Sequence, residues 1–163
     1  MSYLGVVNLI RTECNTINPN GLFVHCRRWD ASLEFDSPNC QIALYPMTAN
    51  ISMANHFYES WIIVMGFYFE DAPDSTNEDR ELLIASAQNL VQIFLNDLEN
   101  TEGIEISGIR TEPSYRQMAG TYTGVILNFT LGATSDLCAT DTYVLNTDNV
   151  ILTNTDGTPI QNT

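Results

Sequence analysis

The sequence predicts an α+β fold with an N-terminal helix, a mixed or antiparallel sheet that carries one long packed helix and a long β-hairpin, and an extended C-terminal arm. Two segments repeat apolar residues at the three- and four-residue spacing of a helix. Between and after them lie runs rich in β-branched and aromatic residues, which favour strands. A length of 163 residues suits one domain with a sizeable core. We expect that domain to span residues 1–132 and the arm to span residues 133–163.

The first helix is expected directly after Ser2, whose hydroxyl can cap a helix N-terminus. Apolar side chains then recur in a stripe along one helical face. The helix should end before the sequence NPNG at residues 18–21, because proline and the Asn-Gly pair break helices. The stripe consists of Tyr3, Val7, Ile10, Cys14 and Ile17.

Several strands are predicted in the next fifty residues. Residues 22–35 predict two strand pieces around a turn near Asp30, and residues 41–46 predict another strand. A polar turn is expected at residues 48–60. The run WIIVMGFYF that follows, residues 61–69, is too short to span a bilayer and predicts a buried central strand.

Six acidic residues crowd positions 70–81 and could indicate a metal or catalytic site. Ser75 and Glu78 match a capping box, and acids in the first turn of a helix are favoured by its dipole. The ligand pattern of a calcium loop is missing. We therefore interpret this segment as the start of an amphipathic helix that ends near residues 100–103. Its apolar stripe is Leu83, Ala87, Leu90, Phe94 and Leu98.

A long hairpin is predicted after Gly103. Residues 104–110 form its first arm, residues 113–120 form a loop, and alternating apolar residues between Val125 and Leu131 predict a second arm with one buried side. The loop carries Tyr115, Arg116 and Met118. These residues either contact a partner or belong to an ordinary solvated hairpin tip.

The charge balance excludes several classes of partner. The chain has 20 acidic residues against six basic ones, all six of them arginine, and a net charge of −14. Such a surface is not expected to bind nucleic acid specifically or to bind anionic membranes, because both require basic residues. No targeting or membrane segment is recognised, so the chain is expected to stay in the compartment where it is made. The four cysteines contain no C-x-x-C pair and are expected to be free thiols.

No catalytic, cofactor or metal motif stands out, so we expect neither an enzyme nor a cofactor. His25 and Cys26 are adjacent in a predicted strand, and their side chains should point to opposite faces rather than form a nucleophile pair. The chain lacks a P-loop, a G-x-S-x-G elbow and any lysine. An enzyme that uses two carboxylates brought together by folding remains an alternative.

Two further segments are candidates for subunit contacts. Arg27, Arg28 and Trp29 either anchor an acidic neighbour or form a local ion pair with Asp30 or Glu34. The arm is too poor in apolar residues to form a core of its own. Its two small apolar runs contain Tyr143 and Ile151, and they are expected to lie along the arm's own domain or along a neighbouring subunit.

The chain resembles structural proteins of tailed bacteriophages over about residues 1–132. The segments RRWDASLEFDSPNCQIALYP (27–46), MGFYFEDAPDSTNEDRELLIASAQNLVQIFLNDLE (65–99) and GTYTGVILNFTL (120–131) resemble the neck or tail-barrel ring proteins of crAss-like phages. The order of helix, strands, helix and long hairpin also resembles tail-terminator and tail-completion proteins.

The resemblance implies a structural virion protein without a catalytic site. Copies of the chain would assemble in the host cytoplasm into a closed six- or twelve-fold ring in the phage neck or tail, against portal, adaptor or tail ring proteins. DNA would pass through the ring without being bound, and an acidic lumen would discourage it from sticking. The alternative is a small intracellular α+β module that binds a ligand or a protein partner.

Overall fold

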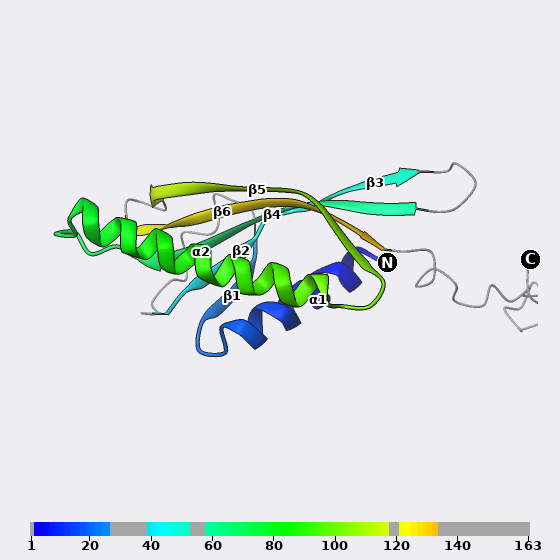
Figure 1. The fold of residues 1–163 in the computed structure, drawn as a ribbon, viewed down its shortest axis with the longest axis horizontal. Coiled ribbons are helices and arrows are strands. Elements are labelled where there is room, and N and C mark those ends of the chain that lie inside the picture. The colour runs from blue at the N-terminus through cyan, green and yellow to red at the C-terminus, as the bar shows by residue number, and fades with distance from the viewer. Residues whose placement is uncertain (1, 27–38, 53–57, 118–120, 134–163) are drawn as a thin grey trace, which may run out of the picture.

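Two helices lie on one face of a six-stranded mixed sheet in the computed structural model of the chain, which describes residues 2–26, 39–52, 58–117 and 121–133 (Figure 1). The predicted α+β class is therefore confirmed. The helices are α1 (Tyr3–Ile17) and α2 (Asn77–Glu99). The strands are β1 (Leu22–His25), β2 (Gln41–Leu44), β3 (Thr48–Ser52), β4 (Tyr58–Glu70), β5 (Ile104–Gln117) and β6 (Tyr122–Ala133).

The strand order is β1-β2-β4-β6-β5, with β3 pairing to β4 beside β2. The pair β1 and β2 is parallel, and the other pairs are antiparallel. Strand β4 is central, as its β-branched and aromatic sequence predicts, and β5 forms one edge of the sheet.

Helix α1 begins and ends where the sequence predicts. The Ser2 hydroxyl accepts a hydrogen bond from the Gly5 amide at 3.2 Å, and the helix ends at Ile17, before the Asn-Pro pair. Its buried residues are Val6, Val7, Ile10 and Cys14. Tyr3, at the start of the predicted stripe, is instead exposed and stacks edge-on against Trp61.

The polar turn expected at residues 48–60 is wrong, because its first part forms strand β3. Thr48 to Ser52 pair with Ile62 to Tyr58 of β4, so β4 also begins three residues earlier than predicted. The resulting hairpin projects from the end of the sheet (Figure 1). Thr48, Ala49 and Asn50 are exposed there, so polar and small side chains are tolerated while the backbone groups are paired. Of the two strand pieces expected in residues 22–35, the first is β1, and the second lies outside the described residues.

Helix α2 begins with a capping box that is shifted by one residue from the predicted one. Thr76 is the N-cap, its hydroxyl accepts from the Asp79 amide at 3.2 Å, and the Asp79 carboxylate accepts from the Thr76 amide at 2.8 Å. The helix end at Glu99 agrees with the prediction. Its buried residues are Ile84, Ala87, Val91, Phe94 and Leu98, whereas Leu83 and Leu90 are only half-buried.

The main core lies between the sheet and the two helices. Phe94 of α2 is fully buried, and its ring centroid lies 5.9 Å from that of Phe67 on β4 and 6.1 Å from that of Phe129 on β6. A smaller cluster on the opposite face contains Tyr45 and Tyr68, whose hydroxyl oxygens are 2.9 Å apart. The predicted alternation in β6 is confirmed, since Val125, Leu127, Phe129 and Leu131 all belong to the main core.

The loop expected at residues 113–120 is shorter than predicted, because β5 continues to Gln117. Pro113 lies inside β5, opposite Val125 of β6. A proline removes a backbone donor and is therefore tolerated only where a strand has a free edge or a bulge. Because β5 is an edge strand, the Pro-containing segment stays in the sheet.

We expect Phe94→Ala to lower the free energy of unfolding by about 3–5 kcal/mol, the range for truncating a buried phenylalanine. The loss follows from the empty space left between Phe67 and Phe129. Urea unfolding followed by circular dichroism measures it. Ile93→Ala, at the neighbouring position that is 47% exposed, should change stability by less than about 0.5 kcal/mol. Equal losses for the two variants would contradict this description of the core.

Candidate functional site

Asp71 is the most deeply buried carboxylate in the described part of the chain, and it joins three elements. It follows β4, and its amide donates to the Thr121 carbonyl at 2.7 Å. Its Oδ2 accepts from Arg80 Nε of α2 at 2.9 Å and from the Thr123 hydroxyl of β6 at 2.9 Å. The Asp71 side chain is fully buried, and that of Arg80 is 14% exposed. The ion pair therefore ties the start of α2 to the hairpin of β5 and β6.

The environment of Asp71 favours its charged form. Burial on its own would raise the pKa of this carboxyl, but the hydrogen bonds from Arg80 and Thr123 outweigh burial and hold the pKa below its usual value. The pKa of Asp79 is also lowered, by its hydrogen bonds to the Thr76 amide and hydroxyl. Asp71 and Asp79 thus have structural partners, and Glu78 lies in the first turn of α2, which agrees with the interpretation of the acidic segment as a helix start.

Arg116 lies beside this ion pair. Its Nε is 3.7 Å from Asp71 Oδ2, its Nη2 donates to the Pro73 carbonyl at 3.3 Å, and its amide donates to the Thr123 hydroxyl at 3.2 Å. Its φ of 46° coincides with a register shift between Ser114 and Gln117. The Arg116 side chain is thus fixed to its own domain, while the neighbouring Tyr115 is 53% exposed. Of this pair, Tyr115 is the residue that is available for a partner.

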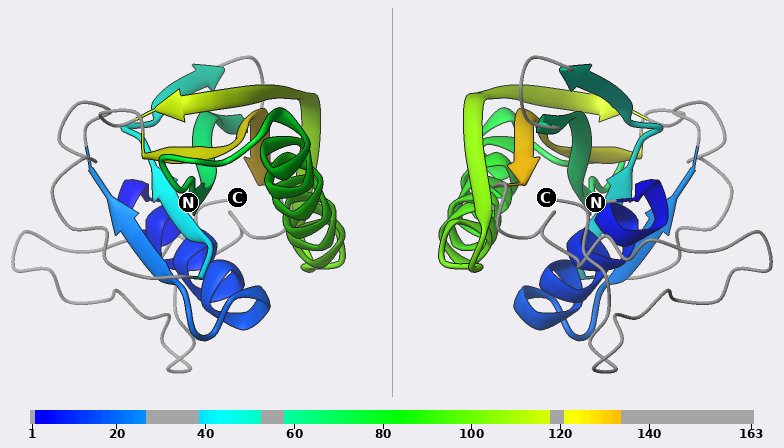
Figure 2. Two further views of the ribbon diagram at one scale, coloured as in Figure 1. Left: turned by 90° about the vertical axis from the view of Figure 1, so that its left-hand side faces the viewer. Right: turned by 90° about the vertical axis from the view of Figure 1, so that its right-hand side faces the viewer.

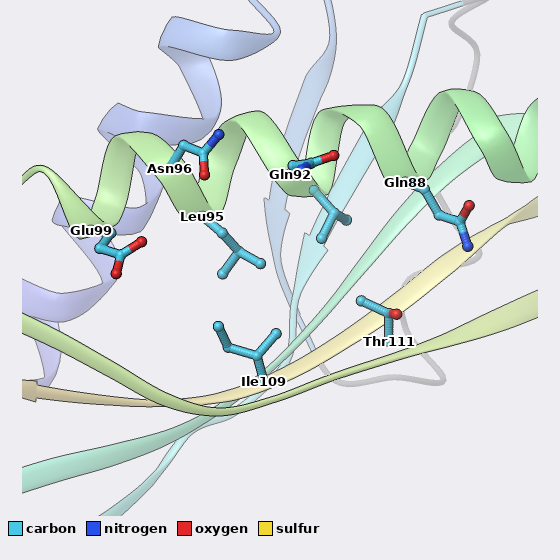
Figure 3. Close-up of a pocket in the computed structure, with 8 residues that line it drawn as sticks. Gln88, Gln92, Leu95, Asn96, Glu99, Ile109 and Thr111 are labelled. Carbon is cyan, nitrogen blue, oxygen red and sulfur yellow. The ribbon is translucent and has the colours of Figure 1, made fainter.

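A groove of about 470 Å³ lies between α2 and the edge strand β5 (Figure 3). Leu95 of α2 and Ile109 of β5 face each other across it, with Gln88 and Thr111 toward one end (Figure 3). The rest of the lining consists of Val91, Gln92, Asn96 and Glu99, and Glu99 is the only charged residue among the described residues that line the groove. Apart from Glu99 and Thr111, these walls are apolar and amide side chains from α2 and β5.

A β-bulge points Ile109 and Thr111 into this groove. Gly108 and Ile109 together oppose the single residue Phe129, because the register shifts between Ser107 and Arg110. Gly108 has a φ of +62°, which favours glycine at this position of a bulge. Before the bulge, Ile104 and Ile106 face the core, whereas after it Ile109 and Thr111 face α2 and Arg110 faces away. If every residue of β5 alternated regularly without a bulge, Arg110 would lie on the groove side together with Ile104 and Ile106.

The segment Leu82–Asn96 of α2 contains no charged residue, although charged residues make up 16% of the chain. Its outer surface is nevertheless exposed, and Leu82 and Ile93 are 68% and 47% exposed. Exposed helix faces usually carry charges, and charged residues are depleted at the cores of protein interfaces. This helix surface, together with the groove and the edge of β5, is the candidate interaction site.

The structure separates His25 and Cys26, as the sequence predicts. His25 Nε2 lies 3.0 Å from the Tyr3 hydroxyl on the α1 side of the sheet, whereas Cys26 packs against the Tyr45 and Tyr68 cluster on the other face. Partial burial and the nearby Arg11 charge lower the pKa of His25. Cys14 and Cys40 are free, buried thiols, and burial raises the pKa of Cys40 to about 12.

Within the described ranges, no group of three or more His, Cys, Asp or Glu side chains is placed to hold a metal ion. No helix there is long and apolar enough to cross a membrane.

Most of the predicted contact residues lie outside the described residues, namely Arg27, Arg28, Trp29, Met118, Tyr143 and Ile151. Only Tyr115 and Arg116 can be placed, and both belong to β5 rather than to a loop. Sequence reasoning missed the Asp71 ion pair and the groove. The uncharged run from Leu82 to Asn96 was the signal in the sequence that could have indicated an interaction surface.

In comparisons with known proteins, no family model and no curated protein matches this chain in sequence.

We expect Asp71→Asn to lower the free energy of unfolding at pH 7 by about 1.5–3 kcal/mol, the contribution of a hydrogen bond to a charged group. The pKa of Asp71 is depressed in the folded state, so its stabilisation is complete above the unfolded value of about 3.9 and is lost as the pH falls through the lower folded value. The stability difference between wild type and variant should therefore shrink below about pH 4. Urea unfolding at several pH values measures it.

The exposed Asp74→Asn is the matched control and should leave stability nearly unchanged at every pH. A difference for Asp71→Asn that stays constant from pH 7 to pH 2.5 would show that its charge is not what stabilises the fold.

Proposed function

We propose that the protein is a structural subunit of a ring in the neck or tail of a tailed bacteriophage, and that it is not an enzyme. Copies of the chain join into a closed ring, in contact with portal, adaptor or tail ring proteins, and DNA passes through its channel. The proposal combines the resemblance over residues 1–132 with the surface of the described domain.

The observation that carries the proposal is the 14-residue edge strand β5 beside an uncharged helix surface. Within the described ranges, no strand pairs with the outer edge of β5. A long edge strand exposes backbone groups that another strand can pair with. The charged residues, Pro113 and the two register shifts of β5 restrict where such pairing is possible. In a ring, each subunit uses one surface against a different surface of its neighbour, and rotation closes the assembly. An edge strand on one side of the domain suits this type of contact.

The charge of the chain is compatible with a DNA channel. A net charge of −14 repels the phosphate backbone, and binding would require basic residues that this chain largely lacks. At physiological salt the repulsion extends about 8 Å from the wall. It therefore acts only on DNA that comes close to the surface and prevents adhesion during passage.

The groove favours a second candidate function, that of a small ligand-binding module. Its volume of about 470 Å³ lies within the range of about 300–1,000 Å³ that is typical of small-molecule sites. Such a module would be a monomer or a dimer with a ligand held between Leu95 and Ile109. The edge strand beside the groove has no role in this alternative, so we prefer the ring.

We expect the purified full-length chain to form a ring-sized oligomer or to bind particles that carry the neighbouring virion proteins. Light scattering measures the mass in solution, and electron microscopy of particles shows the ring. We expect assembly because another chain is needed to cover the edge of β5 and the uncharged face of α2. A stable monomer without affinity for those virion proteins, but with a small molecule in the groove, would replace the ring by the ligand-binding alternative.

A further inference from the structure

The groove beside β5 has the properties of a site for an extended peptide segment. One wall is the edge of a strand whose outer backbone groups face no described strand, and the other wall is α2, which is uncharged there except for Glu99. A peptide added to a sheet edge gains main-chain hydrogen bonds, and its alternate side chains enter neighbouring pockets. Ile109, which is 53% exposed, and the half-buried Leu95 form the apolar part of that pocket.

The chain itself contains a segment with the chemistry of this site. Residues 142–152 read TYVLNTDNVIL, with two β-branched apolar runs and Asp148 as the single charge. Residues two apart, such as Tyr143 and Leu145 or Val150 and Leu152, point to the same side when a segment is extended. One such pair would lie on Leu95 and Ile109, while the backbone pairs with β5.

Charge does not select the occupant of the groove, so the proposed contact depends on apolar and main-chain groups. Residues 134–163 contain four acidic residues and no basic one. Of the four arginines in the described ranges, Arg110 and Arg116 lie on β5, but Arg110 pairs with Glu112 at 2.9 Å and Arg116 lies 3.7 Å from Asp71. Exposed ion pairs add at most about 1 kcal/mol, so charge supplies little of the affinity.

The path of the chain bears on which copy supplies the segment. Strand β6 ends at Ala133, opposite Ile104 at the start of β5, so the chain leaves the domain near the end of α2 (Figure 1). It leaves at the end of the sheet where the hairpin of β3 and β4 projects away from the body (Figure 1), the end that faces the viewer in the right panel of Figure 2. To reach its own groove it would have to reverse direction. The eight residues 134–141 can span about 26–29 Å when extended. This length also suffices for the chain's own groove, so the proposed ring is what assigns the segment to a neighbouring copy.

We propose that the groove between α2 and β5 receives residues 142–152 of a second copy, which add a strand to the edge of β5. This inference rests on the proposed ring, because it assigns the contact between neighbouring subunits. Each copy donates its arm to one neighbour and accepts the arm of the other.

The test uses two variants of the full-length chain, each of which removes one side of the contact. Ile109→Asp places a charge in the groove but leaves the arm intact. The double substitution Leu145→Asp with Leu152→Asp places a charge on the groove-facing side of each apolar run of the arm but leaves the groove intact. Each variant is expected to weaken self-assembly at least about tenfold, because an apolar contact is lost and a charge is desolvated. A variant that combines the groove and arm substitutions should self-assemble no more weakly than either variant alone, because all the substitutions disrupt the same contact.

Mixing the two variants distinguishes a neighbouring arm from an internal one. One intact groove and one intact arm remain in the mixture, so it should form pairs of one copy of each variant and no larger rings. Light scattering measures these masses. Amide hydrogen exchange should show protection of the outward-facing β5 amides in the wild type and in the mixture, but not in either variant alone. Leu4→Asp, at a position on α1 that is 64% exposed, is the control and should behave like the wild type.

Different results would contradict the docking site and the proposed ring. Rings that still form in both variants, with unchanged exchange of β5, would overturn the docking site and leave the ring intact. Loss of β5 protection in the arm variant, Leu145→Asp with Leu152→Asp, at every protein concentration and without a change in mass would show that each arm occupies the groove of its own chain. That result would overturn the donation of the arm by a second copy. A wild-type chain that forms no assembly would overturn the ring itself.

Discussion

The antiparallel pairing of β4 with β6 is the interaction on which the rest of the structure depends. Eleven consecutive residue pairs, from Ser60 with Gly132 to Glu70 with Tyr122, hold the two strands in a single register. Side chains alternate between the faces of this pair, so the register decides which apolar residues meet the helices. Phe67 and Phe129 lie on the helix side because of this register, and there they enclose Phe94 of α2.

The same pairing also creates the polar part of the structure. Asp71 follows the last residue of β4, and Thr121 and Thr123 lie at the start of β6, so the end of the ladder places a carboxylate beside a hydroxyl. Arg80 of α2 then compensates the buried charge. Removal of one partner from such a buried pair is costly, because the remaining charge has no compensation. The start of α2 is therefore fixed to the sheet by charge and the rest of the helix by apolar packing.

The candidate interaction site arises where this regular arrangement is interrupted. The bulge at Gly108 and Ile109 changes which residues of β5 face α2, and a groove remains between the helix and the edge strand. The edge of β5 carries charged residues, Pro113 and two register shifts, which restrict pairing with another strand. The adjacent helix surface, in contrast, carries no charge from Leu82 to Asn96 in an otherwise acidic chain. This uncharged surface suits contact with another polypeptide, which is the basis of the proposed ring.

The sequence by itself determined the class of the fold and the elements with a strong local period. The stripe of Ala87, Phe94 and Leu98 predicted α2, and the alternation in Val125 to Leu131 predicted β6, because burial of one face imposes a period of 3.6 or 2 residues. The contact residues in the arm and in residues 27–29 stay predictions. Tertiary structure decided the strand at residues 48–52, the length of β5, the Asp71 ion pair and the groove. Each of these depends on a partner far away in the chain, such as Thr123 for Asp71, 52 residues away, and a local pattern carries no information about such a partner.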